Sequence, residues 1–218
     1  MSPSIREQSD QLKAAAAGRL PADVVAVFDH SVQGFLDEGI PSDVITVGQP
    51  LAPFTLDDAT GTPVGLDQLV SAGPVVIVFY RGGWCPYCNV ALRTYQRELL
   101  PQLGVFGARL VAVSPQSPDE SLSTAEKAGL EFAVLSDPGS RVAEQIGIAF
   151  QQADEVVTAQ RTLGLDLARV NAEGSTRLPR PTVVIVDRDR IVRFVDVQPD
   201  YTARTEVADI ITALTDLQ

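Results

Sequence analysis

The chain is poor in residues that bind metals, with two cysteines and one histidine among 218 residues. A tetrahedral zinc site needs about four such ligands, and His30 lies far in sequence from both cysteines. We therefore expect no metal site within one chain. A metal bridged between two chains remains an alternative.

Positive charge is also scarce. The 17 Lys and Arg residues face 28 Asp and Glu, and the net charge of −11 disfavours binding to nucleic acid or to an anionic membrane surface. No apolar run approaches the roughly 18 residues of a membrane-spanning helix, and the start of the chain carries no recognisable secretion signal. We therefore expect a cytoplasmic globular protein. In that compartment, paired cysteines are more often catalytic, redox-sensing or metal-binding than structural.

Both cysteines belong to one short motif, Trp-Cys-Pro-Tyr-Cys at residues 84–88. The apolar run 74–80 before it predicts a buried strand, and residues 89–100 after it predict a helix. A cysteine at the start of a helix meets unpaired N–H groups and partial positive charge, which lower the pKa of its thiol. Because Cys88 follows Cys85 by one helical turn, the two are close enough to form a disulfide. The motif therefore predicts a redox-active pair.

The rest of the chain has the element order of an α/β fold. Residues 5–40 carry apolar side chains at helical spacing, and we interpret residues 1–44 as a helical arm that packs on the core or contacts a second copy. Residues 151–179 form a polar, weakly periodic insertion. The remaining strands are expected at 109–113, 132–135, 182–186 and 191–195, and the helices at 117–129, 136–146 and 201–217. In this order, ligands bind at the carboxyl ends of strands, where the motif lies.

Five stretches of the sequence carry a family resemblance: residues 48–56, 76–80 with the cysteine turn, 111–115, 135–138 and 178–187. Together they resemble the peroxiredoxins of the alkyl hydroperoxide reductase and thiol-specific antioxidant group, within the thioredoxin-fold superfamily. The resemblance covers about residues 45–217. It implies a thioredoxin-like domain at 45–218, with a central mixed β-sheet flanked by helices, preceded by the arm as an N-terminal helical extension.

The cysteine motif departs from the common peroxiredoxin pattern, which has Pro and then Thr-x-x-Cys after the strand. Counted from the strand, Arg81 falls at the Pro, Cys85 at the Thr and Cys88 at the cysteine that attacks peroxide. Thioredoxins instead have Trp-Cys-x-x-Cys, which Trp84 and Cys85 match, and there the first cysteine attacks. We assign attack to Cys88 and disulfide closure to Cys85 by the alignment, and the reverse order stays open.

The resemblance also implies roles for residues around the motif. Peroxiredoxins use an arginine to stabilise the thiolate and the peroxide, and Arg180 and Arg81 are the candidates, since a guanidinium carries fixed donors and a permanent charge. Pro181 aligns with the cis-proline that faces the disulfide in thioredoxin folds. Contacts with substrate or partner are expected from Tyr80, Trp84, Pro86, Tyr87 and Pro181.

The function that the resemblance implies is a thiol peroxidase for hydrogen peroxide or organic hydroperoxides. It would need no cofactor, because sulfur carries the electrons, and a thioredoxin-like reductant would recycle it. A homodimer is an option in this family. The first alternative is a thiol–disulfide oxidoreductase acting on protein disulfides through Cys85, favoured by Trp84 and by the missing Thr. The second is a redox-sensing or metal-bridging element that controls a binding surface.

Overall fold

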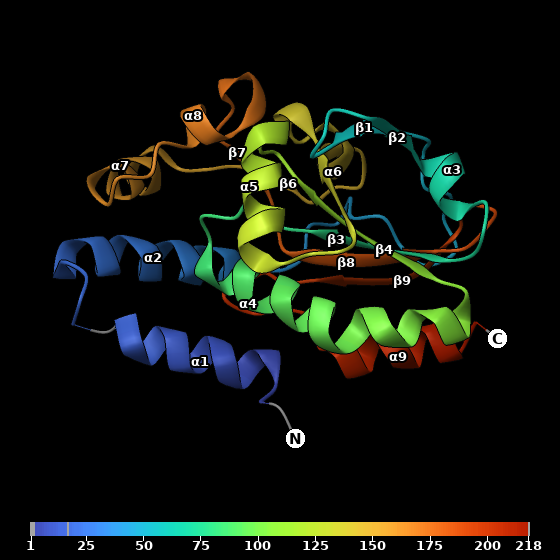
Figure 1. Cartoon of the computed structure of the whole chain (residues 1–218). Helices are drawn as coiled ribbons and strands as arrows, with labels where there is room; N and C mark the ends of the chain where they lie inside the picture. Colours follow the sequence, from blue (N-terminus) through green and yellow to red (C-terminus); the bar gives the residue numbers. More distant parts are fainter. Residues whose placement is uncertain (1–2, 17, 218) are drawn as a thin grey trace.

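The computed structural model describes residues 3–16 and 18–217, and its centre is a mixed seven-stranded sheet in the order β2-β1-β5-β4-β3-β8-β9 (Figure 1). The strands of this sheet are β1 (Thr55–Asp58), β2 (Pro63–Gly65), β3 (Val75–Phe79), β4 (Arg109–Ser114), β5 (Ala133–Ser136), β8 (Thr182–Val186) and β9 (Val192–Val197). A separate antiparallel pair consists of β6 (Ala149–Gln151) and β7 (Arg177–Pro179). The thioredoxin-like α/β fold expected from the sequence is confirmed.

Strand β3 leads directly to the cysteine motif and lies inside the sheet. It pairs in parallel with β4 and antiparallel with β8, and all five of its residues are buried. Its Val, Ile and Phe side chains suit a strand with both faces covered. The strand predicted at 74–80 is therefore confirmed, as are the strands predicted at 182–186 and 191–195, which pair antiparallel as β8 and β9.

Helices cover both faces of the sheet. The α-helices of the described residues are α1 (Ile5–Ala16), α2 (Ala22–Glu38), α3 (Leu66–Val70), α4 (Pro86–Thr94), α5 (Pro118–Ala128), α6 (Arg141–Gln145), α7 (Asp154–Thr162), α8 (Leu167–Val170) and α9 (Val207–Thr215). Alternate residues of β3 enter two separate cores: Ile77 packs in the one with α3 and α6, whereas Val76 and Val78 pack in the one with α4 and α9. In Figure 1, α4 and α9 lie on the same side of the sheet.

The expected helical arm contains two helices, α1 and α2. Helix α1 packs against α4, with Ile5 fully buried, and the Glu206 carboxylate accepts the N–H groups of Ile5 and Arg6 at 3.1 and 2.8 Å. Helix α2 packs against α7, which belongs to the 151–179 insertion. The arm boundary at residue 44 stays a prediction.

Two segments differ in detail from the sequence expectations. The insertion contains α7, α8 and most of the β6–β7 pair, and residues from these three parts share a small core of Val157, Leu167 and Leu178. The helix expected from residue 201 begins only at Val207. Residues before it form a loop in which the Asp200 carboxylate accepts the Thr202 N–H at 2.8 Å, a turn that competes with helix formation.

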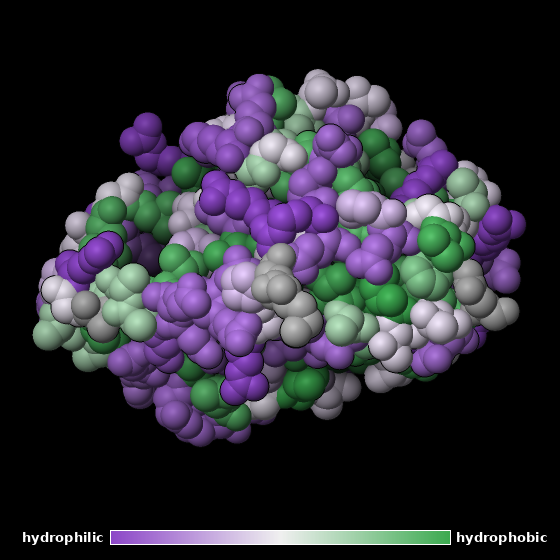
Figure 2. Space-filling view, turned by 60° about the horizontal axis from the view of Figure 1, so that its bottom comes forward, coloured by the Kyte–Doolittle hydropathy of each residue, from purple (hydrophilic) through white to green (hydrophobic). Residues whose placement is uncertain are grey.

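The surface carries hydrophilic and hydrophobic residues side by side. Figure 2 shows a face that is hydrophilic over most of its area, with hydrophobic residues in small groups. Within the part of the chain that the structure describes, no helix combines the length and the hydropathy that crossing a membrane requires.

Candidate active site

The two cysteines lie at the start of α4, directly after the carboxyl end of β3. Cys85 is the N-cap residue of the helix, Pro86 follows as its first residue, and Cys88 lies in the first turn. Pro is suited to this position because its missing N–H has no helical partner. Both cysteines are free thiols, and each is only 1% exposed. The pair is therefore held inside the protein and not on its surface.

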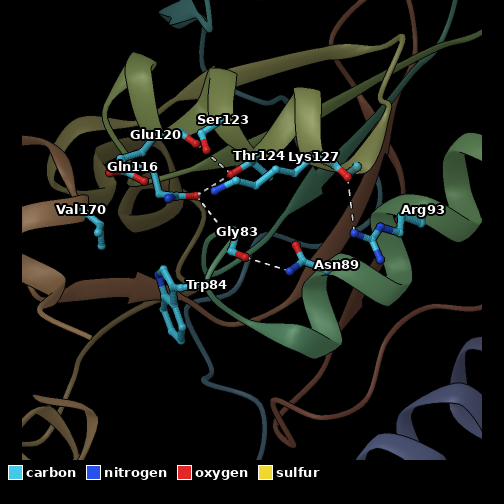
Figure 3. Close-up of a pocket in the computed structure, with 11 residues that line it drawn as sticks. Gly83, Trp84, Asn89, Arg93, Gln116, Glu120, Ser123, Thr124, Lys127 and Val170 are labelled. Carbon is cyan, nitrogen blue, oxygen red and sulfur yellow. Dashed lines mark hydrogen bonds between the residues drawn. The ribbon is translucent and has the colours of Figure 1, made fainter. Parts of the chain in front are cut away.

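The turn between strand and helix is held by side chains from neighbouring elements (Figure 3). Gln116 accepts the Gly83 N–H at 2.7 Å, and the Asn89 side chain donates to the Gly83 carbonyl at 2.8 Å. A Cβ on Gly83 would clash with the Thr124 hydroxyl oxygen, so any other residue there would displace that side chain. Gly82 has a φ of 145°, which side chains rarely adopt. Gly82 and Gly83 are therefore required by the backbone conformation of the turn before the motif.

A residue that sequence reasoning missed contacts both sulfur atoms. The Arg204 guanidinium donates from Nη2 to Cys88 Sγ at 2.8 Å and lies 3.7 Å from Cys85 Sγ. Arg204 Nη1 donates to the carbonyls of Tyr201 and Ala203, which fixes the direction of the guanidinium. Arg204 lies in the loop before α9, within the span expected to be helical, and no motif marks it. No signal in the sequence distinguishes it from other arginines.

The surroundings shift the pKa values of the two thiols in opposite directions. Burial opposes ionisation of Cys88, but the hydrogen bond from Cys85 and the charge of Arg204 outweigh it. The backbone N–H and the charge of Arg81 add to them, so the pKa of Cys88 lies well below its usual value. Burial raises the pKa of Cys85 well above its usual value, and its hydrogen bond to Cys88 adds to the rise. These shifts favour the thiolate form at Cys88 and the protonated form at Cys85.

The two arginines expected from the sequence lie in different places. Arg81 is beside the cysteines, with its guanidinium 4.3 Å from the centre of the Tyr201 ring and 5.0 Å from that of Trp84. Arg180 instead pairs with Glu38 of α2 at 2.7 Å and stacks on Phe35. The arginine side chain that donates to Cys88 Sγ is that of Arg204, which was not one of these two candidates.

The expectation of a cis bond at Pro181 is wrong. Among residues 3–16 and 18–217, no peptide bond is cis. With a trans bond, the chain runs from β7 straight into β8, and the Pro181 carbonyl accepts the Gln198 N–H at 2.9 Å. That bond continues the ladder beyond the pair of Thr182 and Val197. Pro181 is therefore an extended residue that continues the pairing of β8 with β9.

The aromatic residues of the motif surround the thiols. Tyr80 is 1% exposed and packs in the same core as both cysteines. Burial raises the pKa of Tyr80 and also that of Tyr87, whose ring makes an edge contact with Tyr201 at 6.2 Å. Burial raises the pKa of Tyr201 to about 12. These phenols therefore stay protonated at physiological pH.

A cavity of about 310 Å³ borders the motif, between the arm and the insertion. Cys85, Trp84, Pro86 and Tyr87 line it, and Cys88 is not among the lining residues. In Figure 2, a hollow bordered by hydrophobic residues opens at the end of the molecule where α2 and α7 lie. A second hollow of about 240 Å³ lies between α4 and α5 and reaches neither cysteine (Figure 3). Across the described residues, no three Cys, His, Asp or Glu side chains gather as a metal site.

Comparison with known sequences supports one family. A model of the AhpC/TSA family matches residues 47–195. "Putative peroxiredoxin Rv1608c" of Mycobacterium tuberculosis is 31% identical over 115 residues, which cover 53% of this chain and 74% of that protein. Chloroplastic peroxiredoxin Q of Sedum lineare is 33% identical over 104 residues, 48% of this chain and 55% of that one. The matched family region excludes both helices of the arm and also Arg204.

Solved structures agree with this result. Peroxidoxin BcpB from Mycobacterium tuberculosis has a TM-score of 0.64 and 25% identity, covering 80% of this chain and 99% of its own. A peroxiredoxin-like protein from Aquifex aeolicus has the same TM-score at 15% identity, covering 80% and 89% of the two chains, and shares the fold.

Proposed function

The chain belongs to the AhpC/TSA family, and on this premise we propose that it is a thiol peroxidase in which the Cys88 sulfur attacks the peroxide. The observation that carries the assignment is the Arg204 hydrogen bond to Cys88 Sγ at 2.8 Å. The thiolate is the reactive form of cysteine, and Arg204 favours that form at Cys88. The same choice of attacking residue follows from the alignment of the motif.

The proposed reaction begins with attack of the Cys88 thiolate on the O–O bond. The nearer oxygen is transferred to sulfur as a sulfenic acid, and the other oxygen leaves with the organic group, or as hydroxide, and takes up a proton. The Cys85 thiol then loses its proton and attacks the Cys88 sulfenic sulfur. This step forms the disulfide between Cys85 and Cys88 and releases water, so the two thiols have supplied two electrons.

A dithiol returns the disulfide to two thiols by exchange. The family resemblance implies a thioredoxin-like reductant, and the electron count is the same for any dithiol. The alternative of an oxidoreductase for protein disulfides requires a protein substrate to reach Cys85. Because Cys85 and Cys88 are each only 1% exposed, the burial of the pair weighs against it.

The test is stopped-flow mixing of the reduced protein with hydrogen peroxide, following the fluorescence of Trp84, the single tryptophan. Its indole lies beside the motif and 5.0 Å from the Arg81 guanidinium. We expect a fast change that survives Cys85→Ser and is lost in Cys88→Ser. Loss in Cys85→Ser with survival in Cys88→Ser would reverse the assignment. A change no faster than that of a free thiol, together with rapid reduction of insulin disulfides, would overturn the peroxidase.

A further inference from the structure

The cavity beside the motif has features of a ligand site that the peroxide reaction leaves unused. Its walls are largely apolar and come from the arm and from the insertion; they include Leu20, Phe28, Val156, Leu163 and Leu165. Three polar atoms of its lining residues, Gln160 Oε1, Arg81 Nε and Trp84 Nε1, are buried without a hydrogen-bond partner among the described residues. Because each of these atoms is almost fully covered by protein, a molecule in the cavity meets mainly the apolar side chains.

We infer that this cavity admits the reducing thiol, and that its reductant is a low-molecular-weight dithiol with an apolar alkyl body. This inference rests on the proposed function, because it assigns Cys85 as the partner that closes the disulfide. It replaces the thioredoxin-like protein implied by the family resemblance with a small molecule.

The two sulfur atoms differ in their access to the cavity. Cys85 lines the cavity and Cys88 does not, so a molecule in the cavity meets the Cys85 side of the disulfide. Attack there expels Cys88, and the thiol with the lower pKa is the faster leaving group. Arg204, at 2.8 Å from Cys88 Sγ, stabilises the charge that appears on that sulfur. The accessible side is therefore also the chemically favoured one.

The size and lining of the cavity suit a small apolar molecule. Its volume of about 310 Å³ lies at the lower end of the range of roughly 300–1,000 Å³ found for small-molecule sites. Cys85 is 1% exposed and lies behind walls from the arm and α7. A thiol on the surface of a folded protein would bring its neighbouring backbone with it, whereas a short alkyl chain fits between these walls. The apolar lining favours hydrocarbon over a charged thiol.

The electrons balance for a dithiol. One thiolate of the reductant attacks Cys85 Sγ, forming a mixed disulfide as the bond to Cys88 breaks and Cys88 leaves as a thiolate. The second thiol of the reductant loses its proton and attacks the reductant's own bound sulfur. A cyclic disulfide then leaves, and Cys85 takes up a proton. The reductant has lost two electrons, and both protein sulfurs are reduced.

The test uses full-length protein whose disulfide is first formed with diamide, so that it does not depend on the peroxide reaction. Reduction is followed with 1,4-butanedithiol, with dithiothreitol, which adds two hydroxyls to the same carbon chain, and with a thioredoxin. For each disulfide, the rate with butanedithiol is divided by the rate with dithiothreitol. We expect this ratio to be about tenfold higher for the protein than for a small-molecule disulfide, because apolar contact is gained in the cavity.

Variants that fill the cavity give the sharper result. Ser31→Phe, from α2, and Leu163→Trp, from the opposite wall, should each slow reduction by butanedithiol by about tenfold, as expected for loss of roughly two buried methylene contacts. His30→Phe adds the same ring to the neighbouring exposed residue and should leave the rate unchanged. Melting temperatures close to that of the wild type show that the variants are folded.

Two results would overturn the inference: folded filling variants that both keep the wild-type rate with butanedithiol, or a thioredoxin that reduces the disulfide faster than butanedithiol does. Failure of the proposed function looks different. In that case hydrogen peroxide leaves the wild-type thiols unoxidised, while the diamide-formed disulfide still prefers butanedithiol and still responds to Ser31→Phe.

Discussion

Replacing Arg204 with glutamine removes the positive charge that contacts Cys88 Sγ at 2.8 Å. Two unit charges about 4 Å apart interact by about 4 kcal/mol at an effective dielectric constant of about 20. Glutamine keeps one N–H donor and water can enter the vacated space, so we expect roughly half of this stabilisation of the thiolate to be lost. Since about 1.4 kcal/mol is a factor of ten, the peroxide reaction at neutral pH should slow by about ten- to thirtyfold.

The assay is the rate of oxidation by hydrogen peroxide over a pH series. Because the pKa of Cys88 rises in Arg204→Gln, its rate should climb with pH in the alkaline range, where the wild-type rate is already level. Arg204→Lys keeps the charge without the fork of donors, so its rate should fall between the two. Arg180→Gln is the matched control, because it removes another arginine whose side chain is buried and is paired with Glu38 instead of Cys88.

The reasoning would be refuted if Arg204→Gln kept the wild-type rate and pH profile. It would be refuted equally if Arg180→Gln moved the profile toward alkaline pH and Arg204→Gln did not. A uniform loss of rate at every pH in Arg204→Gln would point to a damaged fold, and the Arg204→Lys profile separates that case from loss of charge.

Three further predictions concern the same region. In the wild type, the rate with peroxide should stay level from neutral to alkaline pH and fall only in acid, because the pKa of Cys88 is lowered; a rise near pH 8.5, where free cysteine titrates, would contradict this. Gly83→Ala should cost about 1–3 kcal/mol of stability and slow oxidation, because its Cβ meets a threonine hydroxyl of α5. Gly104→Ala, where the added Cβ meets open space, should change neither the melting temperature nor the oxidation rate in stopped flow. Glu206→Gln should weaken the attachment of α1 by about 1 kcal/mol and speed its hydrogen exchange, and Asp209→Asn, an exposed carboxylate on α9, should not; equal exchange in both variants would be evidence against this anchor.

The sequence alone was sufficient for the central strand and for the fold. The run at 74–80 consists almost entirely of Val, Ile and aromatic residues, and such a run becomes a buried strand largely through local preference and burial on both faces. The position of the cysteine motif at the start of a helix followed from the same local pattern. These features depend on neighbouring residues, which is why periodicity and motif spacing predict them.

The structures of the insertion and the arm were harder to predict from the sequence. Helix α7 is only nine residues long, and its apolar residues pack on partners that come from other parts of the chain. A short helix of this kind owes its stability to tertiary packing more than to its own sequence. The loop of residues 201–206 was misread for a similar reason, since apolar spacing does not reveal that Arg204 donates to carbonyls of its own loop and to a sulfur atom.

The sequence by itself determined that two cysteines form one motif after a buried strand, and it singled out Arg180 and Arg81 as the arginines to consider. Only the tertiary structure decided that Arg204, which follows Cys88 by 116 positions, donates to its sulfur, while Arg180 pairs with the arm. The physical reason is that a charge acts through distance in space, and local sequence preferences carry no information on which distant loop lies over a helix terminus.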